Sequence, residues 1–326
     1  MAKTRLGFDL GSSSMKIALV RDGAVSRLES VRLPENMIDS NGAVTLPHAF
    51  IQFLRQTRRE LSLPRAAAAL VLPASQVICR MVTMPRMTAG QLAMNLPYEF
   101  SDFIQGGPEQ YHCDYALCRP VSEEEENAMP MMAAVASKNI LTSYYRMFTQ
   151  AGISLKIVLP QEMALIQLVQ RRQEGKEFCF VDLGHLSTRI TVVRGDRIQA
   201  TRQIALGGRN MDMLIADELG IDAFLAGTYK MENYQDIQSG RGVAEVCDRI
   251  AVEILKVINF YQFTYRSSEL EGIYLAGGGA GIPALREAVS GMVGLELLDP
   301  GELLDAPEQE TAAGIFAAGA ALGGQP

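Results

Sequence analysis

Two distant segments of the chain share one pattern. Residues 8–20 read FDLGSSSMKIALV, and residues 181–193 read VDLGHLSTRITVV. Each has Asp-Leu-Gly, then a short stretch with hydroxyl side chains, then an apolar run, which is typical of two strands joined by a tight turn. An internal repeat of this kind predicts two similar lobes. The 326 residues are enough for two domains of roughly 150 residues each.

The repeated turn carries residue types that bind phosphate. The first strand of each pair ends on an acid, Asp9 or Asp182, and the glycine that follows lets the backbone turn tightly and expose its N–H groups. Such turns can hold phosphate oxygens. Serine hydroxyls and the Lys16 cation add donors, and the two acids could hold the waters of a magnesium ion. Taken alone, a turn of this kind is more often an ordinary β-turn, because Asp, Gly and Ser are common turn residues.

A third glycine-rich element lies near the end of the chain. An expected strand at 272–275 continues into AGGGAG at 276–281, and a helix is expected at 283–292. Without side chains, the glycines let a flat ring or a phosphate approach the backbone, and the helix N-terminus favours negative charge. The alternative interpretation is a flexible connection between a strand and a helix.

Composition excludes several classes of function. Thirty Lys and Arg against thirty-seven Asp and Glu give a net charge of −7, which argues against a nucleic-acid-binding surface. The five cysteines include no CxxC pair, so neither a disulfide framework nor a zinc site is expected, and a reducing cytoplasm fits best. His48 and His112 have no second ligand at metal-binding spacing. No apolar stretch reaches the length of a membrane span, and the Ala-rich segment 311–322 is too short to serve as an anchor.

The segment from residue 78 onward predicts a small inserted α+β unit. Its expected order is strand, helix, strand, strand, helix, strand. The run of four glutamates at 123–126 is expected to be a solvated loop tip, because like charges resist packing. Gly175 is expected to mark a hinge or linker. The elements expected here and on either side are strands at 67–72, 77–84, 111–117, 129–136 and 153–159 and helices at 48–61, 88–103, 139–151 and 161–173.

The two turns and the glycine-rich bend, in this order, resemble the phosphate-1, phosphate-2 and adenosine motifs of the superfamily of actin, sugar kinases and heat-shock chaperones. Within it, most of the chain resembles the PilM family, the actin-like cytoplasmic proteins of type IV pilus assembly machines, which are related to FtsA. The segments that carry this resemblance are 8–20, 78–104 with Glu99, 205–230 and 271–300.

The resemblance implies an α/β fold, namely the two-lobed, actin-like ATPase fold, a duplicated ribonuclease H-like fold. It also implies a small inserted α+β subdomain, called 1C, which in PilM and FtsA replaces subdomain 1B of actin and MreB. The expected divisions are 1–77 for the first-lobe core (1A), 78–153 for the insert, 154–177 for the rest of that core, 178–204 for the second-lobe core (2A), 205–264 for subdomain 2B, 265–310 for the rest of the second core, and 311–326 for a connecting helix that returns to the first lobe.

The resemblance also implies that ATP lies between the lobes. Its phosphates would contact Asp9, Gly11, Ser12, Ser13, Ser14 and Lys16 from the first lobe and Asp182, Gly184, Ser187 and Thr188 from the second. Gly207 and Gly208 would line the cleft, Lys230 would reach the ribose, Gly277, Gly278 and Gly279 would back the adenine, and Asp9 and Asp182 would hold Mg²⁺ through water. His185 and Leu186 depart from the small residues usual in the phosphate-2 turn.

The sequence identifies candidate catalytic residues less clearly than it identifies nucleotide-binding residues. Family members often have Asp and Glu at the start of the helix after Leu159, where this chain has Gln161 and Glu162. Gln161 is the better candidate for positioning water, because an amide can orient water without being a strong base. Helix starts also favour Gln and Glu for capping alone. Glu253 is a weaker candidate, equally explained as a helix surface charge. We therefore expect at most a weak ATPase.

The leading function is an ATP-binding scaffold. In the PilM family such a scaffold binds, in a groove of the first lobe, the short cytoplasmic tail of PilN, a bitopic inner-membrane protein. The resemblance implies a cytoplasmic protein held at the inner membrane through that partner, with self-association into a ring as a further possibility. Two alternatives stay open. A small-molecule kinase would need a catalytic Asp, but the motif aspartates are already assigned. A filament or division protein like FtsA would usually end in an amphipathic helix, which 319–326 does not supply.

Overall fold

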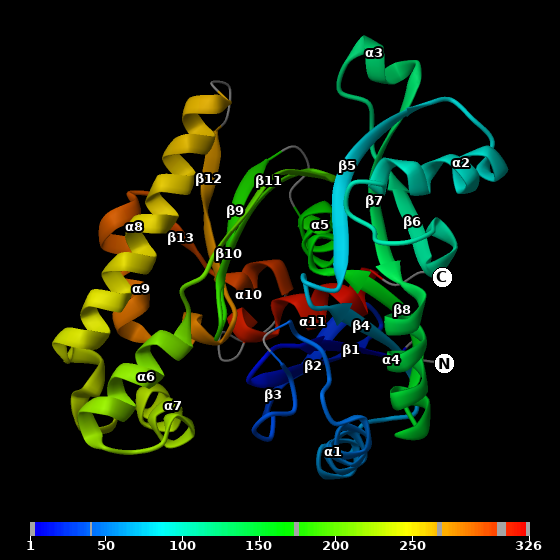
Figure 1. Ribbon diagram of the computed structural model, residues 1–326. Helices are drawn as coiled ribbons and strands as arrows, with labels where there is room; N and C mark the ends of the chain where they lie inside the picture. The colour runs from blue at the N-terminus through cyan, green and yellow to red at the C-terminus, as the bar shows by residue number, and fades with distance from the viewer. Residues whose placement is uncertain (1–3, 40, 173–175, 266–268, 305–310, 324–326) are drawn as a thin grey trace.

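The computed structural model describes residues 4–39, 41–172, 176–265, 269–304 and 311–323. Two five-stranded sheets form the cores of two lobes, and a three-stranded sheet stands beside them (Figure 1). The expected hinge at Gly175 lies outside the described residues. The α/β, two-lobed architecture predicted from the repeated turn is confirmed.

The first sheet has the order β3-β2-β1-β4-β8, in which β1 to β3 are antiparallel and β4 and β8 join in parallel. Helices α1 and α4 pack on it, and the rings of Phe8 and Phe148 meet edge to face with their centroids 5.2 Å apart. The bounds are β1 (Thr4–Leu10), β2 (Ser14–Arg21), β3 (Ala24–Arg32), α1 (Pro47–Glu60), β4 (Ala67–Leu72), α4 (Lys138–Gln150) and β8 (Ser154–Pro160).

The second sheet repeats this plan with the order β11-β10-β9-β12-β13. Helices α8 and α9 cover it, and the helices α6 and α7 and the short helix η3 are inserted between β11 and α8, below the second sheet in Figure 1. The bounds are β9 (Glu177–Leu183), β10 (Thr188–Arg194), β11 (Arg197–Ile204), α6 (Gly208–Leu219), α7 (Ala223–Glu232), η3 (Tyr234–Ser239), α8 (Arg241–Thr264), β12 (Leu270–Ala276), η4 (Gly278–Gly281), α9 (Pro283–Val293), β13 (Leu297–Leu298) and α10 (Pro300–Leu304).

Two helices pack against each other between the sheets. Helix α5 (Gln161–Arg172) follows the first lobe but contacts β10 and β11 of the second, whereas α11 (Thr311–Gly323) follows the second lobe and contacts β1 and β2 of the first. Small residues allow this close approach: a Cβ on Gly319 would lie 2.4 Å from the carbonyl oxygen of Ala164. Helix α11 is thus a buried core helix. No helix in the described ranges has both the length and the apolar character to cross a bilayer.

The inserted unit contains the sheet β5-β7-β6, whose apolar face packs on α2 and the short helix η1. The expected helix over 88–103 is wrong beyond Asn95, because Pro97 has no N–H to donate to the α-helical ladder and the chain continues as a tighter turn. The bounds are β5 (Val77–Pro85), α2 (Ala89–Asn95), η1 (Leu96–Phe100), η2 (Pro108–Gln110), β6 (Tyr111–Leu117), α3 (Glu123–Glu126) and β7 (Ala128–Ser137).

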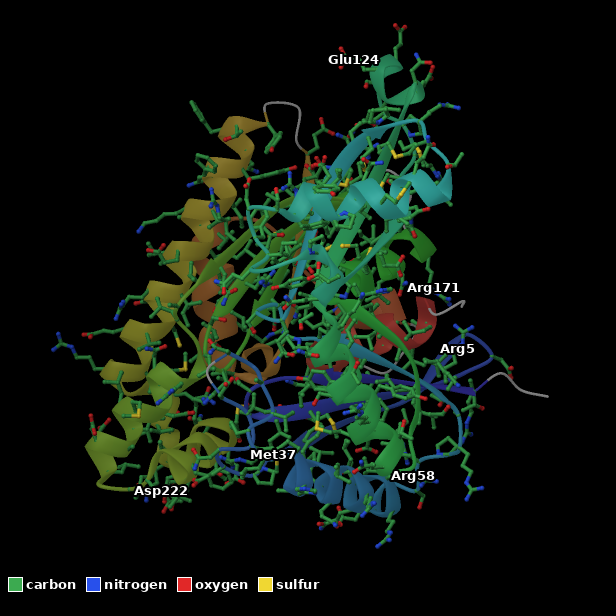
Figure 2. All side chains as sticks on the ribbon, turned by 45° about the vertical axis from the view of Figure 1, so that its right-hand side comes forward. Arg5, Met37, Arg58, Glu124, Arg171 and Asp222 are labelled. Atoms are coloured by element: carbon green, nitrogen blue, oxygen red, sulfur yellow. The ribbon has the colours of Figure 1, made fainter. Side chains whose placement is uncertain are left out.

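Two parts of the insert differ from expectation. Helix α4, expected within it, packs on α1 and buries Tyr144, Met147 and Phe148 in the core of the first lobe. The glutamate run was expected to be a solvated loop, and this is wrong for Glu125. Residues 123–126 form one helical turn, and Glu125 pairs with Arg197 of the second lobe, while Glu124 projects at the tip (Figure 2).

Candidate functional site

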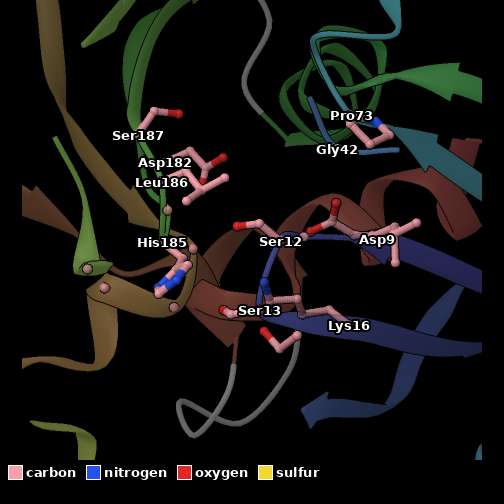
Figure 3. Close-up of a pocket in the computed structure, with 18 of the residues that line it drawn as sticks. Asp9, Ser12, Ser13, Lys16, Gly42, Pro73, Asp182, His185, Leu186 and Ser187 are labelled. Carbon is pink, nitrogen blue, oxygen red and sulfur yellow. The ribbon is translucent and has the colours of Figure 1, made fainter. Parts of the chain in front are cut away.

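A cavity of about 830 Å³ lies between the lobes. Figure 3 shows the turn with Ser12 and Ser13 facing the turn with Asp182, His185 and Ser187 across it. Most residues assigned to the nucleotide from the sequence line this cavity. They are Asp9, Gly11, Ser12, Ser13, Ser14, Lys16, Gln161, Asp182, Gly184, Ser187, Gly208, Lys230, Gly277, Gly278 and Gly279.

The two turns have the same internal geometry. The N–H of Gly11 donates to the carbonyl oxygen of Ser14 at 3.1 Å, and the N–H of Gly184 donates to that of Ser187 at 3.1 Å. A Cβ on either glycine would lie within 3 Å of that same carbonyl oxygen. Both positions therefore need glycine for the turn to close.

Some assigned residues lie behind the cavity wall. Thr188 is fully buried, and its hydroxyl donates to the carbonyl oxygen of Leu206 at 2.9 Å. A Cβ on Gly207 would lie 2.6 Å from the carbonyl oxygen of Gly184, so this glycine lets α6 start close to the turn. Glu253 pairs with Lys256 on α8, away from the cavity lining.

The two acids of the turns both have pKa values above the usual value of a carboxyl group. Burial raises the pKa of Asp9 to about 6, with Lys16 opposing and Asp182 adding to the rise. Burial also raises the pKa of Asp182, which accepts a hydrogen bond from Gln161 Nε2 at 2.8 Å. The Lys16 side chain is buried and forms no ion pair within the described part of the chain. A divalent cation bound with a polyphosphate would face the two carboxylates, and the phosphate oxygens would face the Lys16 ammonium.

The donor set fits magnesium held together with phosphate. Among the described ranges, no group of three or more His, Cys, Asp or Glu side chains is placed to hold a metal by itself. Of the four acidic residues that line the cavity, Asp9 and Asp182 belong to the two facing turns, whereas Asp212 is paired with Lys230. Mg²⁺ is usually bound by one or two carboxylates, with waters and phosphate oxygens completing its shell.

The glycine-rich bend needs glycine for two reasons. Gly277 has φ +79 and ψ 175, a region almost restricted to glycine, and a Cβ there would lie 2.3 Å from Asp182 Oδ1. A Cβ on Gly278, by contrast, would have no atom within 4 Å. The bend therefore brings backbone to the cavity edge and leaves open space beside it, as a flat ring would require.

Helix α5 begins at the cavity and joins it to the second lobe. Gln161 donates to Asp182, as described above, and Arg189 on β10 donates to Glu162 at 2.9 Å. Glu162 is buried in this ion pair and does not line the cavity. The two candidate catalytic side chains thus bridge the lobes.

Lys230 and His185 share a buried partner that sequence reasoning missed. Lys230 Nζ donates to Asp212 Oδ1 at 2.5 Å and to the carbonyl oxygen of Gly208 at 3.0 Å. His185 Nδ1 lies 3.4 Å from Asp212 Oδ2, and burial lowers the pKa of His185, which favours the neutral imidazole. Lys230 lines the cavity, but its ammonium group is already engaged in holding α7 against α6.

Arg32 was also missed. It extends from β3 of the first lobe to α7 of the second, where it donates to Thr228 Oγ1 at 2.5 Å and to the carbonyl oxygen of Phe224 at 2.7 Å. Its guanidinium carbon lies 3.5 Å from the centre of the Phe224 ring. No local pattern could signal this contact, because the partners are almost two hundred residues apart.

A second cavity, of about 570 Å³, lies between the inserted sheet and β8; we call it the insert groove. Strand β6 is an edge of its sheet and β8 is an edge of the first sheet. The lining is largely apolar and includes Tyr115, Met132, Tyr145, Leu155, Ile157, Val158 and Met163, with His112, Asp114, Lys156 and Gln167 as polar members.

The model of one protein family, described as type IV pilus assembly protein PilM, matches residues 7–306. Among solved structures, a PilM-PilN type IV pilus biogenesis complex gives a TM-score of 0.82 at 23% identity over 99% of each chain.

More distant structures share the fold. The ethanolamine utilization protein EutJ from Carboxydothermus hydrogenoformans gives a TM-score of 0.61 at 18% identity, over 99% of this chain and 90% of that one. MreB5 of Spiroplasma citri bound to ADP gives 0.52 at 13% identity, over 97% and 94%. These similarities confirm the actin-like fold. Because the family model spans nearly the whole sequence, the chain belongs to the PilM family of type IV pilus assembly proteins.

Proposed function

We propose that this chain is an ATP-binding scaffold of the type IV pilus assembly platform. The observation that carries the nucleotide site is the pair of matching turns that face each other across the cavity. The buried Lys16 lines the same cavity and forms no salt bridge among the described residues. The turns would hold the phosphates, Asp9 and Asp182 would hold Mg²⁺ through water, and the glycine-rich bend would back the adenine.

The same geometry argues for slow hydrolysis. A rapid ATPase needs a group free to orient or activate water near the terminal phosphate. Here Gln161 is hydrogen-bonded to Asp182, and Glu162 is ion-paired with Arg189. We therefore expect turnover far below the ordinary enzyme value of about 10 per second.

We infer that the partner is a PilN-like bitopic protein, whose short cytoplasmic tail occupies the insert groove. The groove lies between two sheet edges and has an apolar lining. An extended peptide can add to such an edge through main-chain hydrogen bonds while its side chains enter apolar pockets. Binding there would hold the chain at the cytoplasmic face of the inner membrane.

The nucleotide site is tested by titrating purified protein with MgATP in a calorimeter. Lys16→Met removes the buried cation and should weaken binding at least tenfold, since a charge-assisted contact to phosphate is lost. Lys256→Met, a matched change on the exposed face of α8, should leave affinity unchanged. Wild-type protein that does not bind MgATP would refute the proposed site.

The partner is tested by pull-down from detergent-solubilised membranes, with and without MgATP, followed by mass spectrometry. We expect recovery of a single-span protein with a short cytoplasmic tail. Placing a charge in the groove, as in Ala116→Asp, should abolish that recovery without altering MgATP affinity. Recovery by this variant equal to wild type would refute the groove as the binding site.

A further inference from the structure

We propose that an ion-pair latch between the inserted unit and the second lobe transmits the state of the nucleotide cavity to the insert groove. This inference rests on the proposed function and names the element that regulates it. The latch consists of Glu125 on the insert and Arg197 at the start of β11.

The latch is a bidentate ion pair at the boundary between the inserted unit and the second lobe. Arg197 Nη1 donates to Glu125 Oε1 at 2.9 Å, and Nη2 donates to Glu125 Oε2 at 2.6 Å. Nη2 also donates to the carbonyl oxygen of Arg119 on the insert. The Arg197 side chain is only 10% exposed and that of Glu125 is 19% exposed. Bidentate pairs of arginine and carboxylate are among the stronger and more directional polar contacts.

Further contacts make the junction specific. The backbone N–H of Arg119 donates to Asp196 Oδ2 at 2.7 Å, and Cys118 Sγ lies 3.4 Å from the carbonyl oxygen of Asp196. Beneath them, side chains of both units belong to one apolar cluster, which includes Met81, Cys118 and Met132 from the insert and Val193 and Ile198 from the second lobe. The insert is therefore docked on the turn between β10 and β11.

The insert is joined covalently only to the first lobe. It leaves β4 through residues 73–76 and returns at α4. The insert groove lies between the insert and β8 of the first lobe. If the second lobe moves relative to the first, the latch makes the insert follow it, and the width of the groove must change.

The two cavities also share a wall. Leu72, at the end of β4, lines both the nucleotide cavity and the insert groove. Pro73 and Ala74 line the nucleotide cavity, and Val77 lines the groove. The turn through which the insert would pivot thus lies between the two sites. A ligand that contacts both lobes would act on the groove through this pivot and the latch together.

Such coupling is reciprocal. If nucleotide favours one arrangement of the lobes and the peptide favours the same groove width, each ligand changes the affinity for the other by the same factor. Couplings of this kind are commonly about 5-fold to 150-fold. A chain without the latch would still bind both ligands, but independently.

The first experiment needs no partner. Hydrogen-deuterium exchange is measured on the full chain with and without saturating MgATP, with binding checked by calorimetry. In wild type, nucleotide should change exchange in the groove strands β6 and β8. In Glu125→Gln, which removes the charge of the latch carboxylate, that change should fall at least 3-fold while the exchange change in the β1–β2 turn remains. Wild type that binds MgATP with no change in β6 or β8 would overturn the coupling.

The second experiment measures affinity for a fluorescent peptide of the PilN-like protein's cytoplasmic tail. MgATP should change its dissociation constant at least 5-fold in wild type and less than 2-fold in Glu125→Gln or Arg197→Met. The charge-swapped double variant Glu125→Arg, Arg197→Glu should recover part of the effect. Arg241→Met, which removes an exposed helix ion pair, is the control and should behave as wild type.

The outcomes distinguish the proposed partner from the proposed coupling between the two sites. No peptide binding in any condition refutes the proposed partner, whereas peptide binding that is insensitive to MgATP in wild type refutes the coupling alone. Coupling that survives intact in both latch variants assigns it to another route and refutes the latch.

Discussion

The raised pKa of Asp9 predicts that the empty nucleotide site lowers the free energy of unfolding of the protein. Above pH 6, ionised Asp9 is held in a half-buried position beside a second acid, at a cost that the unfolded chain does not bear. Asp9→Asn removes that charge while keeping the shape of the side chain. The variant should therefore be more stable than wild type in the absence of nucleotide, although it loses a candidate magnesium ligand.

The size of the gain follows from the pKa. A rise from 3.8 to about 6 corresponds to up to about 3 kcal/mol at about 1.4 kcal/mol per pH unit. Because the folded state holds the Asp9 proton more tightly, this cost is absent well below pH 3.8, grows as pH rises, and is complete above the folded pKa. The advantage of the variant should therefore shrink to about half at pH 5.

The assay is urea unfolding followed by circular dichroism, since the chain has no Trp, in chelator and without nucleotide at pH 7.5 and pH 5. Asp102→Asn, at an exposed position of the insert, is the control and should lie within about 0.5 kcal/mol of wild type. A variant that is no more stable than wild type at pH 7.5, or whose advantage is equal at both pH values, would refute the reasoning. Added MgATP should reverse the order by stabilising only the wild type.

Two further perturbations test particular contacts. Gly277→Ala should destabilise the chain by about 1–3 kcal/mol, because its Cβ would meet the Asp182 carboxylate, whereas Gly278→Ala should keep wild-type stability because its Cβ meets no protein atom within 4 Å. Thermal unfolding without nucleotide compares the two variants, and equal loss of stability in both would contradict the prediction. Tyr261→Phe removes the 2.6 Å hydrogen bond to buried Glu177 and should cost about 1–3 kcal/mol in urea unfolding, so an unchanged midpoint would count against that bond.

Local sequence patterns predicted most of the turns and side chains that line the nucleotide cavity. The turns at Gly11 and Gly184 and the bend at Gly277 are each specified by a few adjacent residues, so the sequence was enough to predict them and the two-lobed fold. The Asp212 partner of Lys230 and the Arg32 contact with α7 could not be predicted in this way. Each joins residues from separate elements, whose meeting depends on how the chain packs.

The same limit explains the errors in the insert. The pattern of α4 predicts a helix with one apolar side, but which sheet receives that side is decided by the core around Phe148. Four adjacent glutamates predict exposure, and only the position of Arg197 on another lobe decides that Glu125 is partnered. The break at Pro97 was visible in the sequence, because proline ends an α-helical ladder.

The packing of α11 on the sheet of the first lobe bears on how the chain folds during synthesis. The sheet of the first lobe contains residues 4–32, yet the helix that packs on β1 and β2 comes from residues 311–323. During synthesis that face of the sheet stays uncovered until residues 311–323 have left the ribosome. The first lobe therefore cannot mature as an independent early unit. A nascent chain halted before α11 would present the apolar surface around Gly7 to chaperones and proteases.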